Sequence, residues 1–323
     1  MNTFVFTCGD PNGIGPEIVI KTIEKVLNKK DRFVIVSPKN LFDSFPSFKK
    51  IKSSLQFVKD EKQVINAKSA NVQIFEFSGG KLSPGKPTKT SGKISFQSLQ
   101  TAVKLVQKIN SAALITAPIS KEAWGLNKNS YEGHTDFLGE YFNCKTPLML
   151  FYSPNMIAGL VTIHKPIKSV SSLLNRRNIS AIIQAVQTTL TRDFKIDNPN
   201  IAVLGLNPHA GENGRIGKEE LDVIKPVIEK YKNVFGPFVP DAFFGRKLFK
   251  KFDAVIGMYH DQVLIPFKLL NFDRGVNFTA NLPVVRTSPD HGTAFDIAYK
   301  NIADPMSMIE SYKLAKRVLK NRN

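Results

Sequence analysis

Histidines are the residues of this 323-residue chain that point most directly to chemistry, and there are five of them. Three follow apolar, strand-like runs: His164 ends LVTIH, His209 follows IAVLGLNP and His260 ends AVIGMYH. Open α/β sheets bind ligands at the carboxyl ends of their strands. Three imidazoles delivered to such ends favour a site for one divalent metal ion with positions left open for a substrate. Each histidine by itself is more often a hydrogen-bonded structural group, so the spacing leaves both interpretations open.

Charged and amide side chains are dense in the segments around His260 and His291. Amide, lysine and arginine donors bind phosphate or carboxylate, and arginine does so bidentately. The donors in these segments are Lys268, Asn277 and Arg286. The carboxylates that can lie near a cation are Asp241, Asp261 and Asp290. Single residues of these types usually lie on a solvated surface, whereas their clustering here favours a binding site.

The segment GDPNGIGPE, residues 9–17, joins the first expected strand to the first expected helix. Its glycines either let the backbone approach an anionic ligand at the helix N-terminus or allow a demanding turn. It lacks the pattern G-x-G-x-x-G, so the sequence has no Rossmann fingerprint here. Residues 80–87 come close to a P-loop, but Pro87 replaces the hydroxyl residue that would hold Mg²⁺, which excludes that motif.

Short β-branched or aromatic runs alternate with helical periodicity along the chain, which predicts an α/β fold with parallel strands. The expected strands are residues 3–7, 32–37, 72–77, 112–116, 148–152, 158–163, 201–205 and 254–258. The expected helices are residues 16–30, 95–109, 179–190, 218–231, 293–300 and 307–319. Residues 78–92 form the longest polar connection, and a loop of that length in a compact domain is usually functional.

Composition narrows the class of protein. Hydrophobic residues make up 42% and charged residues 22% of the chain, as in ordinary globular proteins. Apolar runs are too short for a membrane helix, there is no secretory pattern at the N-terminus, and two distant cysteines suit a reducing compartment, so we expect a cytoplasmic protein without membrane association. The net charge of +18 is spread in short runs, which argues against a nucleic-acid partner and favours anionic metabolites.

Nine motifs in order resemble the 4-hydroxythreonine-4-phosphate dehydrogenase (PdxA-type) family of vitamin B6 biosynthesis, and they cover nearly the whole chain. They are GDPNGIGPE, KPTKTSG, APISKEAW, GHTDFL, TIHKPI, LNPHAGENGRIGKEE, GPFVPDAFF, MYHDQVLIPFK and the GVNF to RTSPDHGTAFDIA region. The sequence departs from the family at Asn281, where glycine is usual, and at Asp136, where glutamate is frequent. Neither departure removes a matched functional residue.

The resemblance implies an architecture like that of isocitrate and isopropylmalate dehydrogenases, with two α/β/α lobes and a central cleft. We expect residues 1–130 and 270–323 to form the first lobe. Residues 131–269 would form the second lobe, which carries the metal ligands and the dimer contacts. The family also implies a homodimer with its active site at the interface.

The resemblance further implies oxidation of 4-phosphooxy-L-threonine with NAD or NADP to a β-keto acid, which loses CO₂ to give 3-amino-2-oxopropyl phosphate. The ligands of the divalent ion, which is Zn²⁺, Mg²⁺ or Co²⁺, fall by motif position on His164, His209 and His260. The residues that contact the phosphorylated substrate fall on His134, Thr135, Lys268, Asn277 and Arg286. We assign proton transfer, as a hypothesis, to Asp241, Asp261 or Lys268, which are titratable groups in the matched segments.

Three other functions remain open at this point. A related dehydrogenase acting on erythronate or threonate 4-phosphate would use the same metal and phosphate contacts. A zinc hydrolase would use the three histidines to activate water, and it would turn over without nicotinamide. A basic nucleic-acid-binding protein would bind DNA or RNA in a strongly salt-dependent manner and would need no metal.

Overall fold

The computed structural model describes residues 1–66 and 72–323, which form two compact units. The first unit comprises Met1–Pro147, Leu282–Asn321 and Asn323, and the second comprises Leu148–Asn281 and Arg322. The chain therefore passes between units at 147 and 282, compared with the expected boundaries at 130 and 270.

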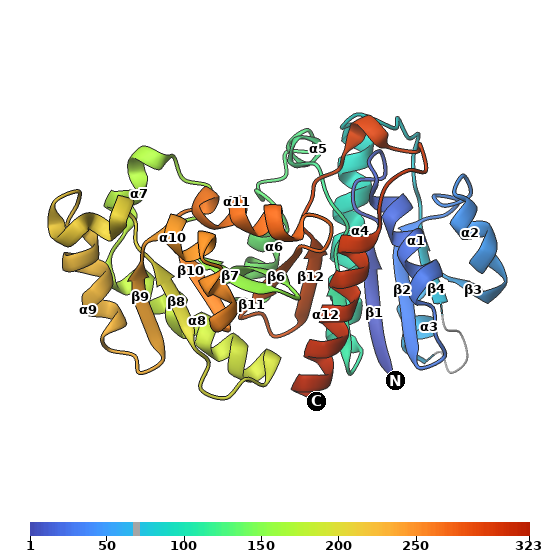
Figure 1. The fold of residues 1–323 in the computed structure, drawn as a ribbon. Helices are drawn as coiled ribbons and strands as arrows, with labels where there is room; N and C mark the ends of the chain where they lie inside the picture. The colour runs from blue at the N-terminus through green and yellow to red at the C-terminus, as the bar shows by residue number, and fades with distance from the viewer. Residues whose placement is uncertain (67–71) are drawn as a thin grey trace. The chain divides into compact units, whose positions relative to one another are not determined.

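A parallel sheet forms the centre of the first unit (Figure 1). Its strands, in spatial order, are β3 (Leu55–Val58), β4 (Val72–Phe77), β2 (Asp31–Pro38), β1 (Asn2–Thr7), β5 (Ala112–Ile115) and β12 (Val285–Pro289). Every pairing between these neighbours is parallel. Strands β1, β2 and β5 are buried along almost their whole length, as expected for a sheet covered on both faces.

Successive side chains of β1 point to opposite faces of the sheet and show how the layers of the first unit pack. Val5 belongs to an apolar cluster with Leu99 and Val103 of the long helix α4 (Lys89–Lys108). Phe4 points to the other face, where its ring meets that of Tyr312 from α12 (Met306–Arg322) edge to face at 4.8 Å. This unit therefore has helices on both faces of its sheet. Its remaining helices are α1 (Gly15–Val26), α2 (Pro46–Ile51), α3 (Glu61–Asn66), α5 (Lys121–Gly125) and α6 (His134–Tyr141).

The second unit has a mixed sheet. In spatial order its strands are β11 (Val276–Ala280), β6 (Leu148–Ser153), β7 (Met156–Leu160), β10 (Ala254–Gly257), β8 (Ile201–Leu204) and β9 (Val234–Phe238). The pairings of β6 with β11 and β7 are antiparallel, and the run from β7 to β9 is parallel. Consequently β7, β10 and β8 end at the same edge of the sheet, in neighbouring positions.

Helices cover this sheet on two faces. From α11 (His260–Asn271), Val263, Leu264 and Phe267 join the apolar cluster that includes Leu160 and Val255. On the opposite face, Val186 of α8 (Arg176–Phe194) lies close to Gly159 of β7. The remaining helices are α7 (Ile167–Leu173), α9 (Lys225–Ile228) and α10 (Pro240–Gly245). No helix in the described residues is both long enough and apolar enough to cross a membrane.

Three expectations about local structure are wrong or incomplete. Helix α4 begins at Lys89 rather than residue 95, because Thr88 and Ser91 form a capping box that starts it within the expected loop. Residues 293–300 contain only the 3-10 turn Phe295–Ile297, since Ala294 and Tyr299 have positive φ angles. The expected helix 218–231 is a π-helical turn, Glu220–Ile224, followed by the short α9.

Candidate active site

Strand order in the second unit brings the strand ends that precede the three candidate metal ligands to the same side of the sheet. Strand β10 lies between β7 and β8, and all three run in parallel. His164 follows the end of β7, His260 follows the end of β10, and His209 follows the end of β8. The register pairs Leu160 with Gly257, so the chain segments that carry His164 and His260 leave the sheet side by side.

The rings of His164 and His260 lie together, with 5.7 Å between their centroids and 40° between their planes. Both line a cavity of about 310 Å³, together with Thr162, Lys165 and Tyr259 among others. His164 has a φ of +50°, an uncommon conformation for a residue with a side chain. On His260, Nδ1 lies 2.7 Å from Oδ1 of Asp261 and forms a hydrogen bond with it. This contact fixes the orientation of the ring and leaves Nε2 as the free ligand atom.

His209 lies outside this pair. It begins a run of five residues with positive φ angles, His209–Asn213, and its side chain is exposed. Among residues 1–66 and 72–323, no three His, Cys, Asp or Glu side chains come close enough to hold one ion. One chain therefore brings together two of the three proposed ligands, while the third lies on the loop that follows the neighbouring strand.

The other candidate residues of the second unit differ in their surroundings. Asp261 lines the cavity of the histidine pair, whereas Asp241 is exposed in the first turn of α10 and is not among the residues that line it. Lys268 lies in the last turn of α11, the helix that begins at His260. On β11, Oδ1 of Asn277 is enclosed and has no hydrogen-bond partner among the described residues. A buried acceptor of this kind is rarely left without a donor, so Asn277 is suited to a ligand.

In the first unit, His134 and Arg286 form a second group of candidate residues. His134 begins α6, its ring meets the indole of Trp124 at 5.8 Å, and its Nε2 is enclosed with no hydrogen-bond partner in the described part of the chain. Burial, together with the positive charge of Arg286, holds the pKa of His134 well below its usual value. The ring is therefore neutral near pH 7, and its unsatisfied nitrogen can bind a ligand.

Arg286 is a buried cation. Its side chain on β12 is 3% exposed, and Nη2 and Nε donate to Oγ1 of Thr116 at 2.7 and 3.2 Å. Burial lowers the pKa of this guanidinium to about 9, which still leaves it charged at neutral pH. A buried positive charge beside a neutral imidazole favours an anionic ligand, because a hydrogen bond between two charged groups is stronger than one between neutral groups. Thr135 follows His134 in the same helical turn and is partly buried.

The glycine-rich turn has a structural role. A Cβ atom at Gly9, Gly13 or Gly15 would come within 2.4 to 2.6 Å of a backbone oxygen of the protein itself, so these glycines allow close packing. Asn12 fastens the turn to the polar loop: its amide donates to the oxygen of Lys86 at 2.9 Å and to Oγ1 of Thr88 at 3.2 Å. Of the two interpretations of this segment, the demanding turn is the one that the geometry favours.

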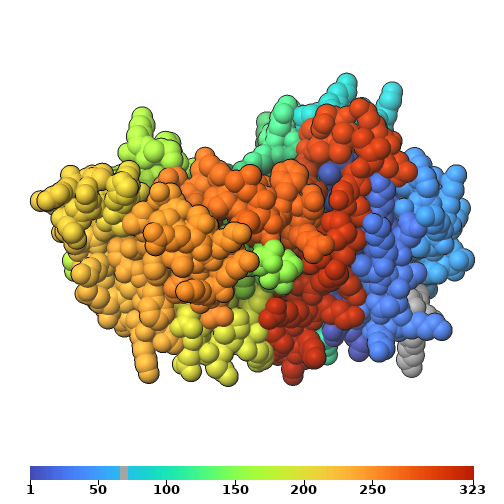
Figure 2. Space-filling view, viewed as in Figure 1, coloured from blue at the N-terminus to red at the C-terminus, as the bar shows by residue number. Residues whose placement is uncertain are grey.

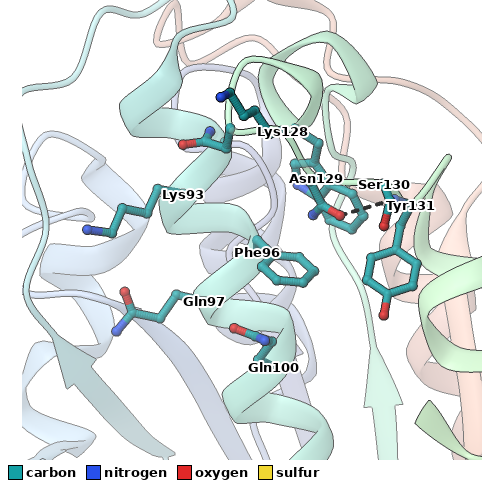
Figure 3. A pocket seen from close by; sticks show the side chains of 11 residues that line it. Lys93, Phe96, Gln97, Gln100, Lys128, Asn129, Ser130 and Tyr131 are labelled. Atoms are coloured by element: carbon teal, nitrogen blue, oxygen red, sulfur yellow. Dashed lines mark hydrogen bonds between the residues drawn. The ribbon is translucent and has the colours of Figure 1, made fainter. Parts of the chain in front are cut away.

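A second cavity, of about 410 Å³, lies in the first unit between α4 and the segment after Trp124. Figure 3 shows the ring of Phe96 on the side of α4 that faces Tyr131, with Lys93 directed away from it. None of the expected site residues lines this cavity. The two cavities are therefore distinct, and of the expected residues His164, His260 and Asp261 line the other one.

Some residues that shape the site carry no signal in the sequence. Trp124 packs against His134, Thr116 binds Arg286, and Gln262 and Glu220 hold the loops that carry the histidines. Their roles depend on contacts between distant segments. Asn281 had a visible signal: glycine is usual at this position in the resembled family, and the φ of Asn281 is +66°. Asparagine is among the residues that best tolerate this left-handed conformation in place of glycine.

The fold defines the class of protein. Isocitrate dehydrogenase from Methylococcus capsulatus has a similar fold, with a TM-score of 0.51 at 12% identity over 100% of this chain and 87% of that chain. The α/β architecture of isocitrate-dehydrogenase type is thereby confirmed. More specifically, the family model of the pyridoxal phosphate biosynthetic protein PdxA matches residues 28–315. The chain belongs to this family.

Full-length relatives agree with this assignment. The chain is 35% identical to 4-hydroxythreonine-4-phosphate dehydrogenase from Prosthecochloris aestuarii, over 100% of this chain and 98% of that protein. The crystal structure of 4-hydroxythreonine-4-phosphate dehydrogenase from Klebsiella pneumoniae matches with a TM-score of 0.81 and 33% identity, covering 98% of both chains. The chain is thus an oxidoreductase of the PdxA family, as the motifs predicted.

Proposed function

We propose that the chain oxidises 4-phosphooxy-L-threonine with NAD or NADP, and that the β-keto acid so formed loses CO₂ to give 3-amino-2-oxopropyl phosphate for pyridoxal 5'-phosphate biosynthesis. The observation that carries the proposal is the delivery of three imidazoles by adjacent parallel strands, with His164 and His260 only 5.7 Å apart. The names of the full-length relatives support the choice of substrate.

The residues that would hold a divalent ion are His164, His209 and His260. Neutral imidazole nitrogens suit Zn²⁺ and Co²⁺, and a hard ion such as Mg²⁺ prefers oxygen ligands. The donor chemistry therefore fits Zn²⁺ or Co²⁺ better than Mg²⁺. When bound, such an ion favours deprotonation of the substrate hydroxyl and stabilises negative charge on the same oxygen during oxidation and loss of CO₂.

Substrate binding is assigned to His134, Thr135, Lys268, Asn277 and Arg286. Arg286 supplies a buried positive charge for a phosphate or carboxylate oxygen, and the unsatisfied Nε2 of the neutral His134 supplies a hydrogen bond. Fixing the nonreacting phosphate and carboxylate groups would hold the carbinol carbon in place for hydride transfer. This positioning converts an encounter between two molecules into a reaction within one complex.

Proton transfer is assigned to Asp241, Asp261 or Lys268. Asp261 is hydrogen-bonded to Nδ1 of His260, which favours a role in orienting that ring. Separate Asp241→Asn and Asp261→Asn variants test the assignment through the pH dependence of kcat. A flattened limb in one profile would identify the group that moves the proton. Unchanged profiles in both would leave Lys268 as the remaining candidate.

The active unit is proposed to be a homodimer with the site at its interface. Helix α11, which begins at His260 and lies on the surface in Figure 2, exposes Ile265, Leu269 and, just past its end, Phe272 by 58%, 83% and 80%. Apolar side chains in such a row usually mark an interface. A second copy against this helix would also bring further ligands to a site that one chain leaves with two paired imidazoles.

An absorbance assay for reduced nicotinamide tests the proposed reaction. Purified protein is given 4-phosphooxy-L-threonine or erythronate 4-phosphate, with NAD or with NADP. Faster turnover of the threonine derivative supports the proposal, and preference for erythronate 4-phosphate would assign the chain to a related dehydrogenase instead. Hydrolysis of a phosphate ester without nicotinamide would contradict both and favour a zinc hydrolase.

A further inference from the structure

The side chain of Arg286 on β12 extends along the sheet of the first unit toward the carboxyl end of the neighbouring strand β5. The register of these parallel strands sets Arg286 opposite Leu114. Its guanidinium nevertheless reaches Oγ1 of Thr116, which lies two residues beyond Leu114 and just past the end of β5. The carboxyl ends of parallel strands are where α/β proteins bind ligands. Thr116 therefore holds the charged end of Arg286 at the edge of the sheet where a ligand is expected.

The contact between Thr116 and Arg286 is shielded from water and involves one edge of the guanidinium. Both residues are buried. Oγ1 of Thr116 accepts from Nη2 at 2.7 Å and from Nε at 3.2 Å, which are two nitrogens on the same edge of the planar group. Arginine is a long side chain with many rotamers, and its planar group binds anions in a directional manner. Because two donors share one acceptor, a single hydroxyl restricts the direction in which the guanidinium points.

Backbone hydrogen bonds fix the position of Thr116 itself. Its N–H donates to the oxygen of Thr287 at 3.0 Å, which continues the pairing of β5 with β12 beyond the end of β5. On the other side, the N–H of Ala117 donates at 3.0 Å to Oγ1 of Thr7, the last residue of β1. The segment that follows β5 is thus tied to both neighbouring strands. The hydroxyl of Thr116 is therefore an acceptor on a fixed piece of backbone.

We propose that Thr116 is a positioning residue that holds the guanidinium of Arg286 in the orientation that binds an anionic group of the substrate. The inference rests on the proposed function, in which Arg286 contacts the substrate, and it adds a residue outside the set assigned to substrate binding. A side chain that is already held in its binding orientation loses little conformational freedom when the ligand arrives. Removal of the hydroxyl takes this acceptor away from two donors of a buried cation, so other orientations of Arg286 become favourable.

Three variants of Thr116 test the proposal through steady-state kinetics with 4-phosphooxy-L-threonine. Thr116→Val keeps the shape of the side chain and removes the hydroxyl, and Thr116→Ala removes the hydroxyl without adding a methyl group in its place. Both should raise KM by about 10-fold, with a smaller change in kcat. Thr116→Ser keeps the hydroxyl and should retain most of the wild-type affinity. Titration calorimetry with the same compound should show a dissociation constant that rises by a similar factor in the first two variants.

Thr287→Val is the matched control. Thr287 is also a buried threonine, follows Arg286 on β12 and donates from Oγ1 to the oxygen of Ser311 at 3.0 Å. Successive residues of a strand point to opposite faces, so its hydroxyl lies on the face covered by α12. The control variant should lose stability, as measured by denaturant unfolding, and keep the wild-type KM. A purely structural hydroxyl at Thr116 would give the same result as this control.

Arg286→Met reports separately on the proposed function and should raise KM by more than Thr116→Val does. If folded Arg286→Met keeps the wild-type KM, the assignment of Arg286 to the substrate is wrong, and the role of Thr116 is refuted with it. If wild-type protein neither binds nor oxidises the compound, the proposed function fails first. If Arg286→Met raises KM while folded Thr116→Val and Thr116→Ala keep the wild-type value, only the role of Thr116 is refuted.

Discussion

The imidazole rings of His164 and His260 lie 5.7 Å apart in a single chain, although they follow strands that are far apart in sequence. Strand pairing produces this contact, because the register sets Leu160 of β7 opposite Gly257 of β10. The two segments of the chain then leave the sheet side by side at the carboxyl ends of their strands, where ligands of α/β proteins bind. Two histidines that each follow a strand in the sequence are therefore neighbours in the folded chain.

Replacing His134 should weaken substrate binding more than it slows the reaction. A His134→Ala variant loses an enclosed nitrogen that has no hydrogen-bond partner in the described protein. We expect KM for the phosphorylated substrate to rise by about 10-fold or more, the effect of losing roughly one hydrogen bond to a charged group, with a smaller change in kcat. Steady-state kinetics measure both quantities.

The single tryptophan allows substrate binding at His134 to be measured independently by fluorescence. Trp124 packs edge to face against His134, so a ligand that binds the imidazole should change the tryptophan emission. Addition of substrate to wild type should give a saturable fluorescence change, and His134→Ala should shift its midpoint to higher concentration. An unaltered midpoint would remove His134 from the substrate site.

The stability of the first unit should depend on pH through Asp10. Asp10 is fully buried, and burial raises its pKa from 3.8 to about 6. The folded state therefore holds the proton more tightly than the unfolded state. This contribution to stability is complete below about pH 4 and is lost as the pH rises through about 6. An Asp10→Asn variant stays neutral, so its free energy of unfolding relative to wild type should increase by on the order of 2 kcal/mol between pH 4 and pH 7.

Denaturant unfolding at several pH values measures this difference. A pH-independent difference for Asp10→Asn would show that the Asp10 carboxyl group has an ordinary pKa.

Replacing Asn281 by glycine should have little effect on stability, whereas replacing it by a β-branched residue should destabilise the protein. Its φ of +66° lies in the left-handed region, where side chains other than those of asparagine and aspartate cost about 1–2 kcal/mol. Asn281→Gly should change the free energy of unfolding by less than about 0.5 kcal/mol. Asn281→Val should destabilise the protein by about 1–2 kcal/mol. Equal stability of the two variants would contradict a left-handed backbone at this position.

Assembly should depend on the exposed face of α11. Leu269→Glu places a charge on a side chain that is 83% exposed, so the fold of one chain should be unaffected while a dimer through this face is destabilised. Light scattering after size exclusion should show a dimer for wild type and a shift toward monomer for Leu269→Glu. Leu126→Glu, at a half-exposed leucine on the other unit, should remain dimeric. A wild-type monomer would remove the interface from the proposed function.

Regular elements with strong periodicity could be predicted from the sequence. The strand Val72–Phe77 was predicted with its exact limits, because its β-branched and aromatic run is bounded by polar residues on the C-terminal side. Other boundaries depended on contacts that no periodicity reveals. Ala294 and Tyr299 interrupt an expected helix with left-handed conformations, and Tyr299 donates from its hydroxyl to the distant oxygen of Pro11. A pattern of apolar residues contains no information about such a bond.

The candidate site shows the same division. His164, His209 and His260 are predicted because each follows a recognisable strand. Strand order places the ends of these strands side by side, and the rings of His164 and His260 lie together. The hydrogen bonds of Gln262 and the packing of Trp124 on His134 could not be predicted, since they join segments whose proximity arises only in the folded chain. Asn281 is an intermediate case between the residues that could be predicted and those that could not. An asparagine at a position where glycine is usual indicates a left-handed backbone, but it does not show which turn requires it.

The central claim is that one divalent ion, held by the proposed ligands His164, His209 and His260, supports both oxidation and loss of CO₂. The most direct test follows reduced nicotinamide and released CO₂ together, with 4-phosphooxy-L-threonine as substrate, before and after removal of metal with a chelator. We predict equal amounts of both products from the loaded protein, loss of both after chelation, and recovery of both when Zn²⁺ or Co²⁺ is returned. Undiminished formation of both products by metal-free protein would contradict the account.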